Sequence, residues 1–175
     1  MRDTSTDHHR FAVLADHGQF YLQDLDAHAA WMRSHADSGA PAGWTEEAVN
    51  SDRISVHPHS IAVGTARSDV VETTVHVHST TPTANLEEAE HVAEADIELP
   101  NGDLAIYGPA DDPGQERHIH LEAGRYRVRV SYIPYVPPVE ADELGDHFLY
   151  RIDVWPVDSL AALAVLKQGP SSWAG

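Results

Sequence analysis

R-H-I-H-L-E-A-G-R-Y-R-V-R-V-S-Y-I, residues 117–133, is the stretch of sequence that decides the fold. Apolar and polar residues alternate in it, both before and after the central Ala-Gly pair. Successive side chains of a β-strand point to opposite faces, so this alternation predicts two strands, each buried on one side. The predicted core face holds Ile119, Leu121, Tyr126, Val128 and Val130. The predicted outer face holds His118, His120, Arg125, Arg127 and Arg129.

The same alternation recurs elsewhere in the chain. It predicts strands over residues 11–22 with Gly18 as a bulge, 53–65 with an interruption at Pro58, 69–79 and 147–155. Residues 86–99 have the Ala and Glu content of a helix, but alternation from Val92 favours a strand that leads into a hairpin at Asn101-Gly102. Short helices are expected over residues 24–36 and 158–168.

Many short strands and few helices indicate the fold class. We expect a mainly β protein, a single-domain antiparallel β-sandwich or jelly roll of about eight strands with one or two short helices. A chain of 175 residues, 42% of them hydrophobic, is long enough for one such core. The expected organisation is a disordered N-terminal tail over residues 1–10, one sandwich over 11–168 and a C-terminal tail over 169–175.

Composition narrows the function classes. The chain has no cysteine, which excludes disulfides, thiolate metal sites and a cysteine nucleophile. Its formal net charge of −17 argues against binding to nucleic acid or to an anionic membrane, and it fits a basic protein partner. Acidity that serves only solubility is the alternative. We also expect a cytoplasmic location, because neither an apolar secretion signal nor an apolar run of membrane-spanning length is seen.

Several short motifs, taken in order, resemble a family of small actinobacterial β-sandwich proteins of uncharacterised function. The matching pieces are G-Q-F-Y-L at 18–22, V-V-E-T-T-V-H-V-H at 70–78, L-E-A-G-R-Y-R-V-R-V-S at 121–131, Y-R-I-D-V-W-P at 150–156 and V-L-K at 165–167. The resemblance covers about residues 11–168. It implies a β-sandwich but no catalytic or metal-binding residues.

A second resemblance rests on the opening strand with Gln19-Phe20, on Trp44-Thr45 and on the acidic, β-rich body that follows. These features are similar to the competence-associated inhibitors of a DNA-entry nuclease. The resemblance implies an inhibitor or immunity-type protein that occupies a nuclease. It carries over no individual site residue.

Three histidine pairs with one residue between them are candidate metal ligands. The pairs are His57/His59, His76/His78 and His118/His120. Residues i and i+2 of a strand share a face, so each pair can offer two imidazoles to one ion. If the strands of the last two pairs were neighbours, His76, His78, His118 and His120 could converge on a divalent transition metal. The alternative is that these histidines line a solvated sheet face, opposite the core.

The alternating arginines Arg125, Arg127 and Arg129 concentrate positive charge in an acidic chain. They are candidates for contact with an anion or an acidic partner. The favoured alternative is cross-strand pairing with nearby carboxylates, because exposed ion pairs are common on sheets. The candidate carboxylates are Glu72, Glu94, Asp96, Glu98 and Asp153.

Familiar catalytic motifs are not found in the sequence. It has no G-x-S-x-G elbow, no H-E-x-x-H, no phosphate-binding glycine loop and no dinucleotide fingerprint. With the acidic charge, this favours a non-enzymatic acidic protein-binding domain without a cofactor; the second resemblance implies an immunity or inhibitor type, for a basic partner such as a nuclease. The alternative is a β-barrel that binds a metal or small ligand through its histidine pairs.

Overall fold

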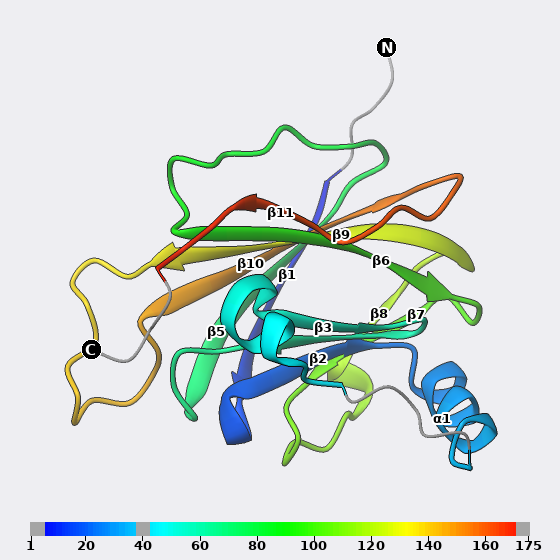
Figure 1. The fold of residues 1–175 in the computed structure, drawn as a ribbon, viewed down its shortest axis with the longest axis horizontal. Helices are drawn as coiled ribbons and strands as arrows, with labels where there is room; N and C mark the ends of the chain where they lie inside the picture. Colours follow the sequence, from blue (N-terminus) through cyan, green and yellow to red (C-terminus); the bar gives the residue numbers. More distant parts are fainter. Residues whose placement is uncertain (1–5, 38–42, 171–175) are drawn as a thin grey trace.

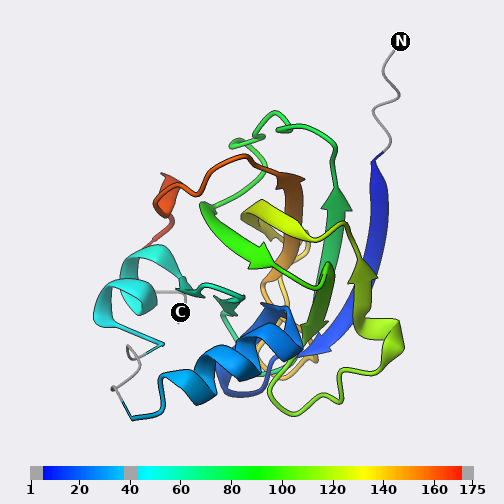
Figure 2. The ribbon, with the colours of Figure 1, turned by 90° about the vertical axis from the view of Figure 1, so that its right-hand side faces the viewer.

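Two β-sheets lie face to face and enclose the core between them (Figures 1 and 2). The structure is a computed structural model and describes residues 6–37 and 43–170. A six-stranded sheet has the order β1-β5-β10-β9-β6-β11, and a five-stranded sheet has the order β3-β4-β2-β7-β8. Neighbouring strands are antiparallel, except that β5 and β10 run parallel. The mainly β sandwich predicted from the sequence is confirmed.

The strands of the six-stranded sheet are β1 (Asp7–Leu14), β5 (Val70–Val77), β6 (His91–Leu99), β9 (Gly124–Pro134), β10 (Phe148–Pro156) and β11 (Ala164–Lys167). Those of the five-stranded sheet are β2 (Gln19–Gln23), β3 (Ile54–His57), β4 (Ser60–Gly64), β7 (Asp103–Tyr107) and β8 (His118–His120). The helical segments are α1 (Leu25–Ser34), the short turns η1 (Asp16–Gly18) and η3 (Gln115–Arg117), and η2 (Ala48–Asp52).

The core consists of the inward-facing residues of both sheets. From residues 117–133, Ile119, Tyr126, Val128 and Val130 are buried in it, and Leu121 packs against it partly buried. The face assignment made from the alternation is therefore confirmed. Burial of these apolar side chains is the main contribution to the free energy that holds the two sheets together.

At three places the chain passes from one sheet to the other, which the sequence did not predict. Residues 11–22 do not form one strand, because the chain turns at η1 and passes from β1 in one sheet to β2 in the other. The hairpin expected at Asn101-Gly102 is also wrong, since β6 and β7 belong to different sheets. The same change of sheet separates β8 from β9. Alternation records which face of a strand is buried but not which sheet the strand joins.

The helix expected over residues 158–168 is wrong as well. Residues 157–163 cross the outer face of the six-stranded sheet as irregular chain, and β11 then pairs with β6 at the sheet edge. Backbone groups of the irregular segment bond to side chains of that face, including the Asp96 carboxylate, which accepts from the Ala161 N–H. These tertiary contacts override the helix propensity of the alanines and leucines.

Other local expectations are confirmed. Helix α1 lies within the predicted range 24–36, and the Asp24 side chain caps it by accepting the Ala27 N–H at 3.3 Å. The interruption at Pro58 is the turn between β3 and β4.

The expected tails differ in part from the structure. Strand β1 begins at Asp7, four residues before the expected start of the domain. Residues 1–5 and 171–175 of the expected tails lie outside the described residues. No helix in the described chain combines the length and apolarity needed to cross a bilayer.

Candidate functional site

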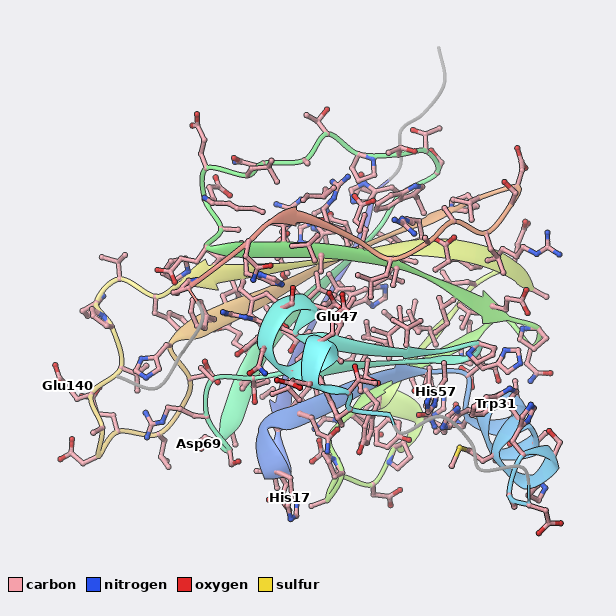
Figure 3. The ribbon with its side chains drawn as sticks, in the orientation of Figure 1. His17, Trp31, Glu47, His57, Asp69 and Glu140 are labelled. Atoms are coloured by element: carbon pink, nitrogen blue, oxygen red, sulfur yellow. The ribbon has the colours of Figure 1, made fainter. Side chains whose placement is uncertain are left out.

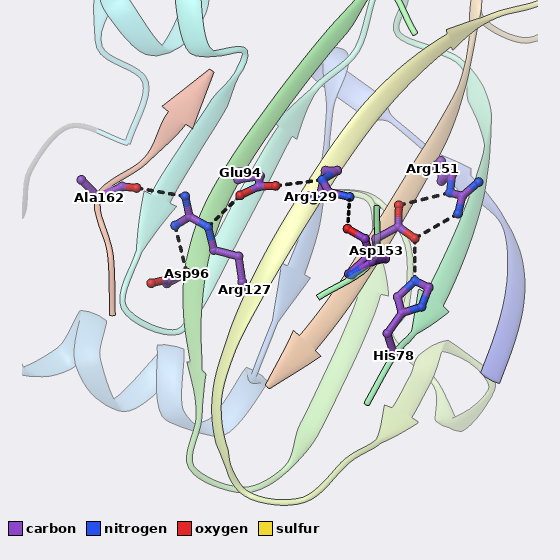
Figure 4. A network of polar contacts seen from close by, with 9 residues as sticks. His78, Glu94, Asp96, Arg127, Arg129, Arg151, Asp153 and Ala162 are labelled. Atoms are coloured by element: carbon purple, nitrogen blue, oxygen red, sulfur yellow. Dashed lines mark hydrogen bonds and ion pairs between the residues drawn. The ribbon is translucent and has the colours of Figure 1, made fainter. Parts of the chain in front are cut away.

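A line of acidic, basic and histidine side chains crosses the outer face of the six-stranded sheet from β6 over β9 and β10 to β5 (Figure 4). We call it the polar belt. Its members are Asp96, Glu94, Arg127, Arg129, Arg151, Asp153, His78 and His76. Alternation along each strand places all of them on the face opposite the core. The belt brings together half of the histidines, arginines and carboxylates that the sequence singled out.

At the β6 end of the belt, carboxylates and arginines form a continuous network. Arg127 donates from Nε to Glu94 Oε2 at 3.1 Å and from Nη1 to Asp96 Oδ1 at 2.9 Å. Arg129 donates from Nε to the other Glu94 oxygen at 2.8 Å. Glu94 thus holds both guanidinium groups. Cross-strand pairing, the alternative favoured from the sequence, accounts for these two arginines.

Irregular segments of the chain cover this network. Arg127 Nη2 donates to the Ala162 carbonyl at 3.1 Å, and Arg129 Nη1 donates to the Pro82 carbonyl at 3.1 Å. The Arg129 guanidinium also lies 5.0 Å from the centre of the Trp155 ring. The two arginine side chains are only 10% and 6% exposed, whereas that of Arg125, 3.6 Å from Glu98, is 53% exposed. Of the three arginines, only Arg125 is open to a partner.

The β10 end of the belt is organised around Asp153. Its Oδ1 atom lies 2.7 Å from His78 Nε2, and Arg151 donates to its two oxygens at 3.2 and 3.1 Å. His76 stands opposite Asp153 in the parallel register of β5 and β10. Burial lowers the pKa of His76, and the positive charge of Arg151 lowers it further. His76 is therefore held as a neutral imidazole at neutral pH.

His118 and His120 lie on β8, in the other sheet from His76 and His78. The convergence of these two pairs, considered from the sequence, does not occur. His118 Nδ1 lies 2.8 Å from Asp103 Oδ2, and its Nε2 lies 2.9 Å from the Pro113 carbonyl. Burial alone would lower the pKa of His118, but the bonds to Pro113 and Asp103 outweigh it and raise the pKa. Both ring nitrogens of His118 are thus engaged by the protein.

The third histidine pair is divided by the β3–β4 turn. The His57 ring lies against the indole of Trp31 from α1, with ring centres 4.8 Å apart (Figure 3). The His59 Nδ1 atom lies 2.9 Å from the Glu98 carbonyl. His28 joins the first group, with its ring centre 5.6 Å from that of His57. The sequence did not indicate this aromatic cluster, because α1 reaches it only through the tertiary fold.

Outside the belt, other cationic side chains are also held by the chain itself. Arg10 forms an ion pair with Glu72, and Arg67 donates to the Glu140 and Ala141 carbonyls at 3.1 and 3.0 Å. Exposed acidic side chains, in contrast, gather on the loops. On loops and short helical turns, they include Glu46, Glu47, Glu87, Glu88, Glu90, Asp112, Glu116, Glu140, Asp142 and Glu143. The exposed loops are therefore strongly acidic, while Arg53, Arg127 and Arg129 are buried.

Sequence reasoning missed the role of Asp153. It placed this residue only among possible ion-pair partners, although the structure sets its carboxylate beside His76 and His78. No local signal could have found it, because residues 76 and 153 become neighbours only through a parallel pairing of distant strands. The H-x-H spacing, in contrast, was visible directly.

Comparisons with known proteins relate the fold to that of two solved structures. No family model matches the chain, and no curated protein matches it in sequence. The chain is similar in structure to ComJ from Bacillus subtilis, the inhibitor of the DNA degrading activity of NucA, with a TM-score of 0.59 and 16% identity over 89% of this chain and 100% of ComJ. It is also similar to the crocagin biosynthetic gene J protein, with a TM-score of 0.53 and 17% identity over 87% of this chain and 98% of that one. At these identities the likeness establishes a common fold, which this chain shares with both proteins.

Proposed function

We propose that the protein is a non-enzymatic binding protein of inhibitor type, which occupies a basic protein partner such as a nuclease. The observation that carries this proposal is the fold likeness to ComJ, which spans the whole of that nuclease inhibitor. It agrees with the resemblance drawn from Gln19-Phe20 and Trp44-Thr45 in the sequence. The lack of familiar catalytic motifs in the sequence supports the non-enzymatic part.

The distribution of charge supports a basic partner. The chain has 28 acidic residues against 11 Lys and Arg, and the network around Glu94 holds two of those arginines nearly buried. The exposed loops therefore present negative charge with little local compensation. Such a surface attracts a basic protein at long range and accelerates its association. A nuclease that binds DNA through a basic surface has the required complementarity.

Inhibition of DNA cleavage tests the proposal. Basic DNA nucleases purified from the source organism would be assayed with increasing amounts of the chain at low ionic strength. We expect inhibition of one nuclease that reaches completion near one chain per nuclease. Because screening weakens charge attraction, the inhibitory concentration should rise several-fold between about 50 and 300 mM salt.

An unrelated acidic protein of similar size and net charge is the matched control. It should give little inhibition at the same concentrations, since general charge attraction lacks a fitted interface. If the nucleases cleave DNA equally well with and without the chain, the proposal fails. Equal inhibition by the acidic control would also contradict it.

A further inference from the structure

We propose that His76, His78 and Asp153 form a binding site for a divalent transition-metal ion at the β5–β10 end of the polar belt. One donor atom of each side chain lies within 4.8 Å of the other two. Two imidazoles and one carboxylate are ligands that zinc and related ions take in proteins. The inference goes beyond the proposed function and does not depend on it.

The fold places these three groups without any special loop. His76 lies on β5 and His78 directly follows its last residue. The two are two residues apart in extended chain, so their side chains share a face of the sheet. The His78 N–H donates to the Val154 carbonyl at 2.8 Å, which continues the parallel pairing as far as this residue. The same pairing sets Asp153 directly opposite His76. Two paired strands thus supply all three ligands.

The spacing of the donors suits an ion after a small adjustment. Metal–ligand bonds of about 2.1 Å in a tetrahedral site separate the donor atoms by about 3.4 Å. His78 Nε2 and Asp153 Oδ1 are now 2.7 Å apart, and the ring nitrogen donates to the carboxylate. An ion bound between them takes the place of that N–H, the neutral ring carries its single proton on Nδ1 instead, and the two atoms move apart by less than about 1 Å.

Neighbouring side chains hold the ligands in place. Arg151 bonds to both oxygens of Asp153 and fixes the plane of the carboxylate. On the other side, the His8 ring of β1 packs edge-on against the His76 ring, with centres 4.2 Å apart. Such outer partners orient ligands and tune affinity. The charge of Arg151 also opposes the cation, so we expect weaker binding than at a closed structural zinc site.

The chain contains its own control for this site. His118 and His120 have the same sequence spacing and also face a carboxylate, that of Asp103. Both His118 nitrogens are engaged, however, by Asp103 and by the Pro113 carbonyl. Within the described residues, these histidines and Asp103 do not form a group with converging donors. Substitution of these two histidines should therefore leave the affinity of the chain for Zn²⁺ unchanged.

Titration of the full-length chain, made without a histidine tag, with Zn²⁺ tests the site. Calorimetry should show one ion per chain with a dissociation constant in the micromolar range, and Co²⁺ in place of Zn²⁺ should give the visible absorption of a nitrogen- and oxygen-liganded site. His76→Ala and His78→Ala should each weaken Zn²⁺ binding by more than about tenfold, because loss of even an outer partner costs 10- to 100-fold. His120→Ala should bind as the unaltered chain does.

Several results would overturn the proposal. These are the lack of stoichiometric Zn²⁺ binding in the unaltered chain, unchanged affinity in His76→Ala and His78→Ala, or an equal loss in His120→Ala. Thermal unfolding of each variant shows whether it is folded. If an alanine variant is unfolded, His76→Gln or His78→Gln takes its place, because glutamine keeps most of the side-chain volume. Because no partner protein is present, the outcome is independent of nuclease inhibition.

Discussion

His91 shows how one buried residue can make stability depend on pH. Its side chain is fully buried on β6, where Nε2 donates to the Asp52 carbonyl at 2.9 Å and Nδ1 accepts the Gly169 N–H at 3.2 Å. This arrangement requires the neutral ring with its proton on Nε2. Burial lowers the pKa of His91 to about 4, although the bond to Asp52 acts in the opposite direction.

The unfolding free energy should therefore fall as the pH falls from about 6.5 to 4. In this range the unfolded chain, with an ordinary histidine pKa, binds the proton before the folded chain does. Above pH 6.5 the contribution of His91 is constant, and its total is on the order of 2–3 kcal/mol. Denaturant unfolding at a series of pH values should show a shallower decline for His91→Gln, which keeps a donor and an acceptor.

His17→Gln is the control, because the His17 side chain is 79% exposed. It should leave the pH dependence of unfolding as it is in the unaltered chain. An identical decline in His91→Gln would show that His91 does not contribute to it.

At the scale of the element, the polar belt crosses four neighbouring strands and is joined to a covering segment. Glu94 of β6 holds two arginines of β9, and Arg127 continues to the carbonyl of Ala162 outside the sheet. A nearly buried charge that loses its partner is costly because water cannot replace that partner. An exposed pair on the same strand is worth little.

Arg127→Ala should accordingly lower the unfolding free energy by about 3–5 kcal/mol, since it leaves Glu94 and Asp96 without their shared guanidinium. Arg125→Ala, two residues away on the same face, should lower it by less than about 1 kcal/mol. Denaturant unfolding measures both. Equal effects of the two substitutions would mean that burial of the network adds nothing to its energy.

The elements show how far sequence reasoning reaches. Alternation located β5 and β10 and assigned the faces of residues 117–133 correctly, because burial on one side of a strand leaves a periodic pattern in its residues. It could not show that η1 and the turn at Gly102 carry the chain from one sheet to the other. For the same reason it identified His76 and His78 but not Asp153, whose place depends on the pairing of distant strands.

At the scale of the whole molecule, the net charge of −17 means that the acidic loops repel one another. Salt screens this repulsion, so the thermal unfolding midpoint should rise between about 20 and 300 mM NaCl. Relief of about 1 kcal/mol would correspond to about 2–4 °C for a chain of this size. Differential scanning calorimetry measures the shift.

Potassium chloride should give the same rise, because screening depends on ionic strength and not on the ion. A midpoint that falls with salt would mean that attractive surface pairs outweigh the repulsion. The net charge can be read from the sequence. Only the structure shows that irregular chain segments cover the Arg127 and Arg129 side chains, so that these two arginines do not offset the acidic loops.

The parallel pairing of β5 with β10 also has a consequence for how the chain matures during synthesis. In the sheet, β10 lies between β5 and β9, although 70 residues of sequence separate the end of β5 from the start of β10. Until β10 leaves the ribosome, both of its neighbours have an open edge, and open edges invite association with other chains. Distant pairings of this kind also form slowly. A nascent or truncated chain that ends before Phe148 is thus expected to need chaperone protection that the complete chain does not.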